Sequence, residues 1–313
     1  MKQEAEPATE RATEPAAAGT RLVGVLAIHG MGNPRPDFAT PLLTRLAAAL
    51  GADAHDVAME PCFWSDLLAA QQEVVWQRVL GSGHPLRWRA LRAWVVRALG
   101  DPAGYLSSYI RADGRHESAY HAIHERLRER LAVLAGRLHA PDAPLVVLAH
   151  SLGGVIVSNY AWDQQHPRPP APTALAEPGA RPFAERVHGH AAFERMETLT
   201  ALVTYGCNLP LFLPPVSPLR SIAFPPPGLP PRLRAAARWL NLYDPDDALG
   251  WPIADVWDEP PAQPIEDVAI EVGGFVEGWT PLAHARYDES AAFVARVAEV
   301  VRGVVAAERG RVG

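Results

Sequence analysis

A serine in the stretch AHSLGG, residues 149–154, has neighbours that would let its hydroxyl act as a nucleophile. The apolar run before Ser151 is typical of a buried strand, and the apolar residues after it resume as a helix, which predicts a strand, a sharp turn and a helix. Such a turn brings the residues two positions away close to the nucleophile, and Ala149 and Gly153 are small enough to fit there. The alternative is a serine that only caps the helix.

A serine hydroxyl needs a base, and the base needs an acid that orients it. His284 is the only histidine C-terminal to the acidic loop YDPDD, residues 243–247, and it precedes the last predicted helix. The chain order serine, aspartate, histidine is therefore available. We expect His284 to take the proton of Ser151 and Asp247 to hold the imidazole tautomer, so that an acyl-enzyme forms and is hydrolysed. A surface position of His284 is the alternative interpretation.

The acidic loop offers three carboxylates for the orienting role. Asp247 is the predicted residue because it lies farthest beyond the strand, where the chain can turn back toward the sheet edge. Asp246 is the second candidate, and Asp244 is expected to form an Asx turn at the strand end. A calcium loop is excluded because Leu249 occupies the position at which that loop requires glycine.

The stretch HGMG, residues 29–32, follows the first apolar run and would lie at the same sheet edge. We predict that the backbone N–H groups of Met31 and Leu152 form an oxyanion hole, the latter because it begins a helix. A plain glycine-containing loop is the alternative. A dinucleotide-binding fingerprint is excluded because Arg35 occupies the position of its third glycine.

Strands and helices alternate along the chain, which is the pattern of an α/β protein. Apolar runs rich in β-branched residues are typical of strands buried on both faces of a parallel sheet. The predicted strands cover residues 21–28, 57–64, 145–149, 199–205, 239–243 and 268–272, and the predicted helices cover 40–50, 65–137, 152–163 and the stretch from about 288. The predicted fold class is α/β, with a mostly parallel, doubly wound sheet and a helical insertion before the strand that leads to Ser151.

One domain, residues 21–305, is expected to contain these elements, with the helical insertion at about 65–137. Residues 1–20 mix Glu, Pro, Ala and Thr without apolar periodicity, which indicates a disordered tail. Residues 306–313 are expected to form a short C-terminal tail. Two proline-rich stretches, 166–182 and 210–231, are expected to be irregular, and Leu, Phe and Pro residues of the second could line an acyl pocket.

The composition excludes several classes of function. Lys2 is the only lysine among 313 residues, so a Walker-type phosphate loop, Schiff-base chemistry and a pyridoxal site lack their lysine. The net charge of −6 argues against a nucleic-acid-binding face, and Cys62 and Cys207 cannot form a disulfide framework or a structural zinc site. We find no secretory signal or membrane-spanning stretch and expect a cytoplasmic protein. The excess of Arg, Ala and Pro is typical of a GC-rich bacterial genome.

The stretch HPLRWRALRAWVVRALG, residues 84–100, places tryptophan and aliphatic residues on one side of a helix and arginines on the other. Such a helix usually packs on its own domain; the alternative is an interfacial helix that docks on anionic lipid. The histidines of HESAYHAIHERLRER, residues 116–130, are interpreted as part of a solvated helix face. His116 and His121 cannot share a face as zinc ligands do, and His121 and His124 can but have no evident third ligand. We expect no metal site and no cofactor.

The stretches HGMG, AHSLGG, NLYDPDD and AHARY, in this order, resemble the motifs of the α/β-hydrolase superfamily, in its lipase and esterase branch. The resemblance covers about residues 21–305, and residues 193–212 are similar to the sixth-strand region of intracellular lipases and phospholipases. It implies an α/β-hydrolase fold and a serine esterase or lipase that cleaves carboxylic esters, with acyl lipids favoured. An insertion at 65–137 departs from the family's cap position, which follows the sixth strand.

Other activities and partners remain open at this stage. Acyl transfer or thioester hydrolysis by the same three residues is one alternative. A non-catalytic relative that binds a partner protein through the 65–137 insertion is another. The expected partners are a small-molecule or lipid ester and, by peripheral contact, a membrane, whereas no nucleic acid is expected. The sequence leaves the oligomeric state undetermined.

Overall fold

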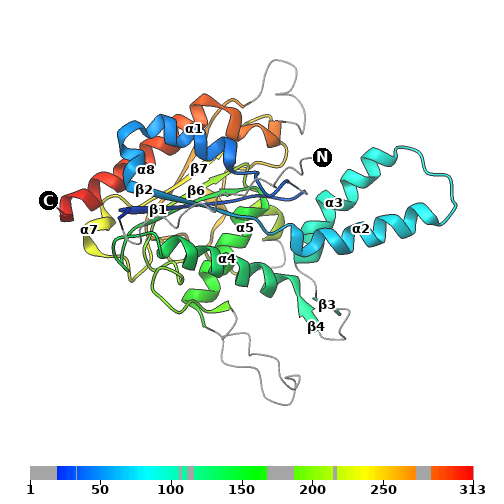
Figure 1. Cartoon of the computed structure of the whole chain (residues 1–313), viewed down its shortest axis with the longest axis horizontal. Helices are drawn as coiled ribbons and strands as arrows, with labels where there is room; N and C mark the ends of the chain where they lie inside the picture. Colours follow the sequence, from blue (N-terminus) through cyan, green and yellow to red (C-terminus); the bar gives the residue numbers. More distant parts are fainter. Residues whose placement is uncertain are drawn as a thin grey trace, which may run out of the picture.

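The computed structural model describes residues 20–32, 34–105, 108–110, 116–167, 187–213, 217–272 and 283–312. Its centre is a six-stranded sheet with the strand order β2-β1-β5-β6-β7-β8, and every pairing in this sheet is parallel. The strands are β1 (Val23–Ile28), β2 (Val57–Cys62), β5 (Leu145–His150), β6 (Leu199–Tyr205), β7 (Arg238–Tyr243) and β8 (Ile265–Ala269). Helices flank the sheet (Figure 1). The predicted α/β class with a parallel sheet is confirmed.

Apolar side chains of successive strand residues pack on opposite faces of the sheet, as the strand period of two requires. Val25 and Ala27 of β1 belong to one hydrophobic cluster with α1 and α8, whereas Leu26 and Ile28 belong to another with α4 and α5. The helices are α1 (Thr40–Leu50), α2 (Asp66–Gly81), α3 (Arg89–Tyr105), α4 (Ala119–Ala135), α5 (Leu152–Gln165), α7 (Pro231–Arg234) and α8 (Ala291–Val312). Short 3₁₀ helices complete the described elements: η1 (Gly51–Asp56), η3 (Leu209–Phe212), η4 (Ala254–Val256), η5 (Ala283–Ala285) and η6 (Tyr287–Glu289).

The predicted insertion at 65–137 divides into two parts with different surroundings. Helix α4 packs on the sheet, because Leu127, Leu131 and Leu134 on one of its faces are fully buried in the cluster below β1 and β2. Helices α2 and α3 instead form a hairpin that projects away from the sheet, with the antiparallel pair β3 (Ser108–Ile110) and β4 (His116–Ser118) near its base (Figure 1). The structure thus assigns α4 to the layer that covers the sheet.

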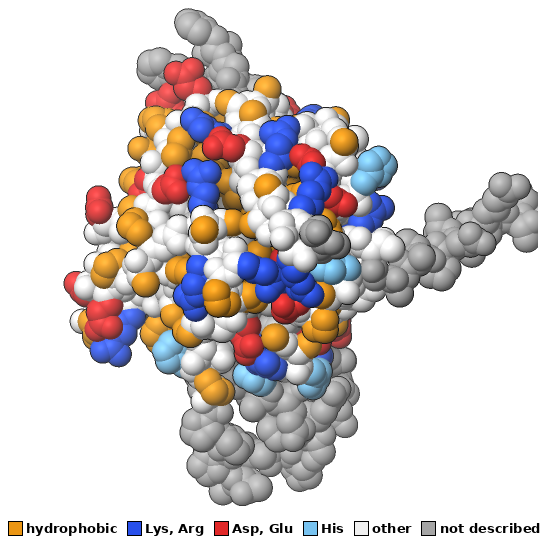
Figure 2. Space-filling view, turned by 90° about the vertical axis from the view of Figure 1, so that its left-hand side faces the viewer, with side chains coloured by type: hydrophobic (Ala, Val, Ile, Leu, Met, Phe, Trp, Pro, Cys, Tyr) orange, Lys and Arg blue, Asp and Glu red, His pale blue; other side chains and the backbone are white. Residues whose placement is uncertain are grey.

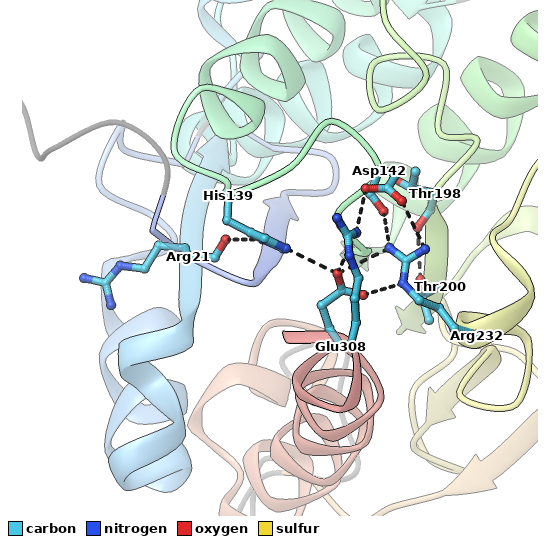
Figure 3. A network of polar contacts seen from close by, with 8 residues as sticks. Arg21, His139, Asp142, Thr198, Thr200, Arg232 and Glu308 are labelled. Carbon is cyan, nitrogen blue, oxygen red and sulfur yellow. Dashed lines mark hydrogen bonds and ion pairs between the residues drawn. The ribbon is translucent and has the colours of Figure 1, made fainter. Parts of the chain in front are cut away.

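The prediction of a short C-terminal tail at residues 306–313 is wrong. Residues 306–312 continue helix α8, and Glu308 within them is fully buried. The Glu308 carboxylate receives two hydrogen bonds from Arg232 of α7, at 2.9 and 3.3 Å, and lies 3.4 Å from His139 Nε2 (Figure 3). A buried carboxylate needs such partners, so this network holds the end of α8 against the sheet. Of the predicted N-terminal tail, residues 1–19 lie outside the described part of the chain.

The structure corrects two further predictions, one about the second proline-rich stretch and one about the histidines of α4. Phe224, in the second proline-rich stretch, is fully buried and packs edge-on against Trp239 of β7, so this phenylalanine belongs to the core and does not line an acyl pocket. His124 is fully buried within α4, so the solvated-face interpretation is wrong at that histidine. Most of the first proline-rich stretch lies in residues 168–186, outside the described residues.

The strand register brings four loops to one edge of the sheet. Ile28 at the end of β1 pairs with Ala149 of β5, His150 pairs with Tyr205 at the end of β6, and Tyr205 also pairs with Leu242 of β7. The carboxyl ends of these strands are therefore neighbours. The loops that follow them contain HGMG, Ser151, the stretch GCN at 206–208 and the acidic loop.

Candidate active site

Ser151 occupies a sharp turn between a buried strand and a buried helix. Strand β5 ends at His150, α5 begins at Leu152, and the serine between them has φ +50° and ψ −121°. Positive φ in a residue other than glycine costs about 1–3 kcal/mol, and such strain persists only where the surrounding structure imposes it. Here the Ser151 N–H donates to the carbonyl of Tyr205 at 2.9 Å, and helix α5 packs among buried residues. The turn therefore fixes the position of the hydroxyl.

His284 lies between the serine and a carboxylate. Its Nε2 is 2.8 Å from Ser151 Oγ, and its Nδ1 is 2.8 Å from Asp247 Oδ2. Asp247 is the acceptor in the second contact, so Nδ1 carries the proton and Nε2 is free to accept the hydrogen of the serine hydroxyl. The structure thus brings together the three side chains predicted from three distant parts of the chain, in the relative positions that general-base activation of a hydroxyl requires.

Asp247 has three hydrogen-bond donors. Besides His284, the Tyr287 hydroxyl donates to Oδ2 at 2.9 Å and the Leu249 N–H donates to Oδ1 at 2.9 Å. Burial raises the pKa of the Asp247 carboxyl, but the hydrogen bond and charge of His284 and the other two donors outweigh it, and the pKa lies below its usual value. The Asp247 side chain is therefore an ionised carboxylate near pH 7.

The other two acidic residues of the loop have different surroundings. Asp246 is exposed. Asp244 Oδ1 accepts the N–H of Asp246 at 2.8 Å, which is the predicted Asx turn, and its Oδ2 accepts the N–H of Val272. Of the two candidates from the sequence, Asp247 contacts His284.

The HGMG loop is held by His29, which is buried and stacks on Trp64 with ring centroids 4.7 Å apart. His29 Nε2 accepts the backbone N–H of Trp64 at 3.1 Å. The Nδ1 of His29 therefore carries a proton and donates it to the carbonyl of Gly30 at 2.8 Å. Burial lowers the pKa of His29 to about 4, which keeps this imidazole neutral near pH 7. Because C=O and N–H of a trans peptide point in opposite directions, the bond to the Gly30 carbonyl turns the N–H of Met31 away from His29.

Gly30 packs directly against the nucleophile candidate. A Cβ at position 30 would lie 2.5 Å from Ser151 Cβ, and a Cβ at Gly153 would lie 2.8 Å from the carbonyl oxygen of His29. Only glycine allows both close approaches. The two predicted oxyanion donors therefore lie on segments in contact with one another: Met31 follows Gly30, and Leu152 is the first residue of α5, whose N–H has no partner within the helix.

Four further residues at this site are not among its predicted residues, although His150 and Tyr287 stand in the stretches AHSLGG and AHARY. Tyr287 holds Asp247, as described above. His150 donates from Nε2 to the carbonyl of His284 at 2.9 Å, and burial lowers its pKa to about 3, so it stays neutral and fixes the loop that carries the base. Asn208 is fully buried and its Nδ2 lies 3.4 Å from Ser151 Oγ.

The fourth such residue is Asp101 of α3, which links the hairpin to the HGMG loop. Its Oδ2 accepts the N–H of Gly32 at 2.7 Å, and its Oδ1 accepts a hydrogen bond from Gln72 of α2 at 2.6 Å. Burial raises the pKa of Asp101 to about 6, although both hydrogen bonds oppose the change. Sequence separations of 69 and 29 residues explain why no local pattern indicates these contacts.

Among the described residues, no three His, Cys, Asp or Glu side chains are arranged to hold a metal ion. Both cysteines are buried free thiols. No helix that the structure describes is long and apolar enough to cross a bilayer. No model of a known protein family matches the chain, and no curated protein matches its sequence.

Proposed function

We propose that this protein is a serine hydrolase that cleaves carboxylic esters through Ser151, His284 and Asp247. The observation that carries the proposal is the continuous contact from Asp247 Oδ2 through His284 to Ser151 Oγ, with 2.8 Å at each step, on a turn where the serine has φ +50°. A buried imidazole between a carboxylate and a strained serine has one well-known use, which is activation of the hydroxyl as a nucleophile.

The proposed reaction has two halves. Ser151 Oγ attacks the ester carbonyl carbon as its proton passes to His284 Nε2, and Asp247 stabilises the imidazolium. The N–H groups of Met31 and Leu152 bind the oxyanion of the tetrahedral intermediate, which collapses when the alcohol leaves with the proton from His284. Water then attacks the acyl-enzyme, with His284 again as the base, and releases the carboxylic acid and free Ser151.

The order of elements supports an α/β-hydrolase fold as part of this proposal. The nucleophile follows a central strand, the acid follows β7, and the histidine precedes the last helix, α8. An apolar acyl group is the proposed acid part of the ester. Leu211, which follows β6 at the same edge of the sheet, has 46% of its surface exposed, and Leu209 beside it contributes to the core next to α5.

The test is release of nitrophenol from nitrophenyl esters of graded acyl length. The wild-type protein is expected to hydrolyse a short or medium acyl ester, and Ser151→Ala is expected to reduce kcat by at least about 10⁴-fold. Circular dichroism and the melting temperature of the variant serve as the control, because removing one oxygen leaves the turn in place. A wild-type protein that is folded but inactive across the panel, or a variant as active as wild type, contradicts the proposal. Addition of competing alcohols to the assay distinguishes hydrolysis from acyl transfer.

A further inference from the structure

The hairpin formed by α2 and α3 leaves large apolar side chains uncovered. Figure 1 shows the hairpin, in cyan, projecting from the sheet on the side opposite the C-terminus of α8. Trp88 and Trp94 have 76% and 55% of their surface exposed, and Leu99 has 60%. The expected packing of this helix on its own domain is therefore wrong over most of its length. Other exposed apolar residues of the hairpin are Val74, Val75, Val79, Leu91 and Val95. Contiguous exposed apolar surface of this kind usually marks an interaction site.

An apolar cleft lies between the two helices close to the tip of the hairpin. It has a volume of about 350 Å³, and its walls include Trp76, Trp88, Leu91 and Val95, with Arg92 beside them. A second cleft of about 250 Å³ lies nearer the base, between Leu68, Val75 and Gly100 among others. The hairpin thus offers apolar surface both on its outside and between its helices.

The outer part of the hairpin, residues 74–100, is basic, whereas Asp66, Glu73 and Asp101 lie nearer its base. Residues 74–100 contain five arginines and no Asp or Glu, whereas the whole chain has a net charge of −6. Among the described residues, residues 74–100 form one ion pair, between Arg97 and Glu73 at 3.3 Å. The arginines without a carboxylate partner there are Arg78, Arg87, Arg89 and Arg92.

Arginines at the opposite end of the molecule are neutralised by neighbours. Figure 2 shows basic and acidic side chains interspersed over the face at which α8 ends. Arg309 contacts both Asp53 and Asp56, and Arg311 contacts Asp142 at 2.8 Å. At this end of the molecule these arginines thus have acidic partners, unlike Arg78, Arg87, Arg89 and Arg92 of the hairpin.

The base of the hairpin is in contact with the candidate active site. Trp64, just before α2, stacks on His29 of the HGMG loop, and Asp101 of α3 accepts the N–H of Gly32. A surface that binds the hairpin would consequently lie on the same side of the molecule as the strand ends that carry Ser151.

From these observations we infer that the α2–α3 hairpin docks on the surface of an anionic lipid bilayer. Tryptophan side chains partition to the boundary between acyl chains and headgroups, because each has a large apolar ring and one N–H donor. Arginines beside them pair with anionic headgroups, each contributing attraction that weakens with salt. Helices that combine these features lie in the interface with their apolar side among the acyl chains. The docking itself does not require catalysis; only its consequence, delivery of Ser151 to esters in the bilayer, rests on the proposed function.

Charge favours a lipid surface over a second copy of the hairpin. Two hairpins placed side by side through residues 74–100 would bring ten arginines together, of which only Arg97 of each copy is paired, with Glu73, and like charges repel. Anionic lipid supplies the missing negative charge, and its acyl chains cover the exposed tryptophans. A dimer through the hairpin is therefore an outcome for the experiment to detect.

Vesicle flotation tests the inference with the full chain carrying Ser151→Ala, so that no lipid is consumed. The protein is expected to float with vesicles of phosphatidylcholine and phosphatidylglycerol at a 70:30 ratio, and much less with pure phosphatidylcholine or at high salt. The triple variant Arg87→Gln, Arg89→Gln and Arg92→Gln is expected to bind the anionic vesicles about 10-fold more weakly or worse. Trp88→Ser combined with Trp94→Ser is expected to lose binding as well, and these exposed positions tolerate the change without a cavity.

A matched control removes the same charge elsewhere. Arg220→Gln, Arg296→Gln and Arg302→Gln alter exposed arginines that form surface ion pairs away from the hairpin, and this variant is expected to float like its parent. The inference is overturned if the parent protein does not float with anionic vesicles, or if the two arginine variants float equally. It is also overturned if light scattering shows a dimer that depends on Trp88 and Trp94 while no vesicles are bound. Hydrolysis of a water-soluble nitrophenyl ester by wild type, measured in parallel, shows separately whether the proposed function holds.

Discussion

In the described part of the chain, two clusters each contain a hydroxyl, an imidazole and a carboxylate in contact. His284 is 2.8 Å from both Ser151 and Asp247. The second cluster, formed by Tyr105, His124 and Asp163, lies where the end of α3 meets α4 and α5. There the hydroxyl is 2.9 Å from Nε2 of the histidine, and the carboxylate is 3.5 Å from Nδ1, which is longer than a good hydrogen bond. Residue types alone therefore do not separate a reactive cluster from a structural one.

The backbone and the surroundings of the hydroxyl make the difference. Ser151 lies on a strained turn at the sheet edge, at the start of α5 and against the HGMG loop. Tyr105 lies at the end of helix α3, is fully buried, and accepts a hydrogen bond from Asn159 at 3.1 Å. Burial raises the pKa of the Tyr105 phenol and lowers the pKa of His124, so both remain neutral. Both hydroxyls are fully buried. The comparison therefore teaches that the strained turn and the helix start beside Ser151, and not exposure, distinguish the proposed nucleophile from a structural hydroxyl.

The largest expected effect comes from the acid of the first cluster. Asp247→Asn should lower kcat by about 10³- to 10⁴-fold, because an amide favours the wrong imidazole tautomer and does not stabilise the imidazolium. Steady-state hydrolysis of a nitrophenyl ester measures the loss. Asp246→Asn is the matched control at the adjacent residue, which is exposed, and should retain wild-type activity. Equal losses in both variants would contradict the assignment of Asp247.

A smaller effect, on stability, is expected from Asp101. Its pKa in the folded protein is about 6, above the usual value of 3.8, so the folded state binds the proton more tightly than the unfolded state. Stability associated with Asp101 is therefore present below about pH 4 and is lost as the pH rises toward 6, by up to about 3 kcal/mol. Asp101→Asn removes this loss while its amide oxygen can still accept the Gly32 N–H.

Urea unfolding of wild type and Asp101→Asn at several pH values measures the difference directly. The stability of the variant relative to wild type should increase from pH 4 to pH 7, and other titrating groups cancel because both proteins contain them. A difference that does not vary with pH would show that the buried carboxyl titrates normally. This measurement separates a carboxyl destabilised by burial, Asp101, from one stabilised by hydrogen bonds, Asp247.

The smallest predicted effect tests the second cluster. Tyr105→Phe leaves His124 Nε2 buried without its partner and should lower the free energy of unfolding by about 1–3 kcal/mol. The nitrophenyl esterase activity should stay within about twofold of wild type, because the phenol takes no part in the proposed reaction. A loss of activity comparable to that of Asp247→Asn, in a variant that remains folded, would break the comparison between the two clusters.

Sequence patterns predicted what local periodicity and chain order can encode. The apolar runs and glycines around Ser151 identified the strand, the turn and the helix, and the parallel sheet followed from the alternation of elements. Asp247 and His284 were predicted from their order after the serine. The register of β1, β5, β6 and β7 then brings their loops together, which is information that no short stretch contains.

The errors arose where tertiary contacts decide the outcome. Residues 306–312 remain helical because Glu308 finds Arg232, which is 76 positions away. The face of α3 has the apolar pattern of a packed helix, yet Trp94 and Leu99 remain exposed because no element of the described structure covers them. His124 belongs to a polar stretch of sequence and is buried with its Nε2 hydrogen-bonded to Tyr105. Glu308 and His124 have partners that are distant in sequence, and the lack of a covering element over α3 is a property of the fold, so composition and periodicity could not identify either.

Reaction with a fluorophosphonate tests the central claim most directly, because the probe phosphonylates only a serine that is activated and lies beside oxyanion donors. We predict one added phosphonyl group per chain, located at Ser151 by peptide mass spectrometry, much slower labelling of His284→Ala, and no change in the rate for Tyr105→Phe. Absence of labelling in folded wild-type protein, or labelling at another residue with Ser151 unmodified, would contradict the account.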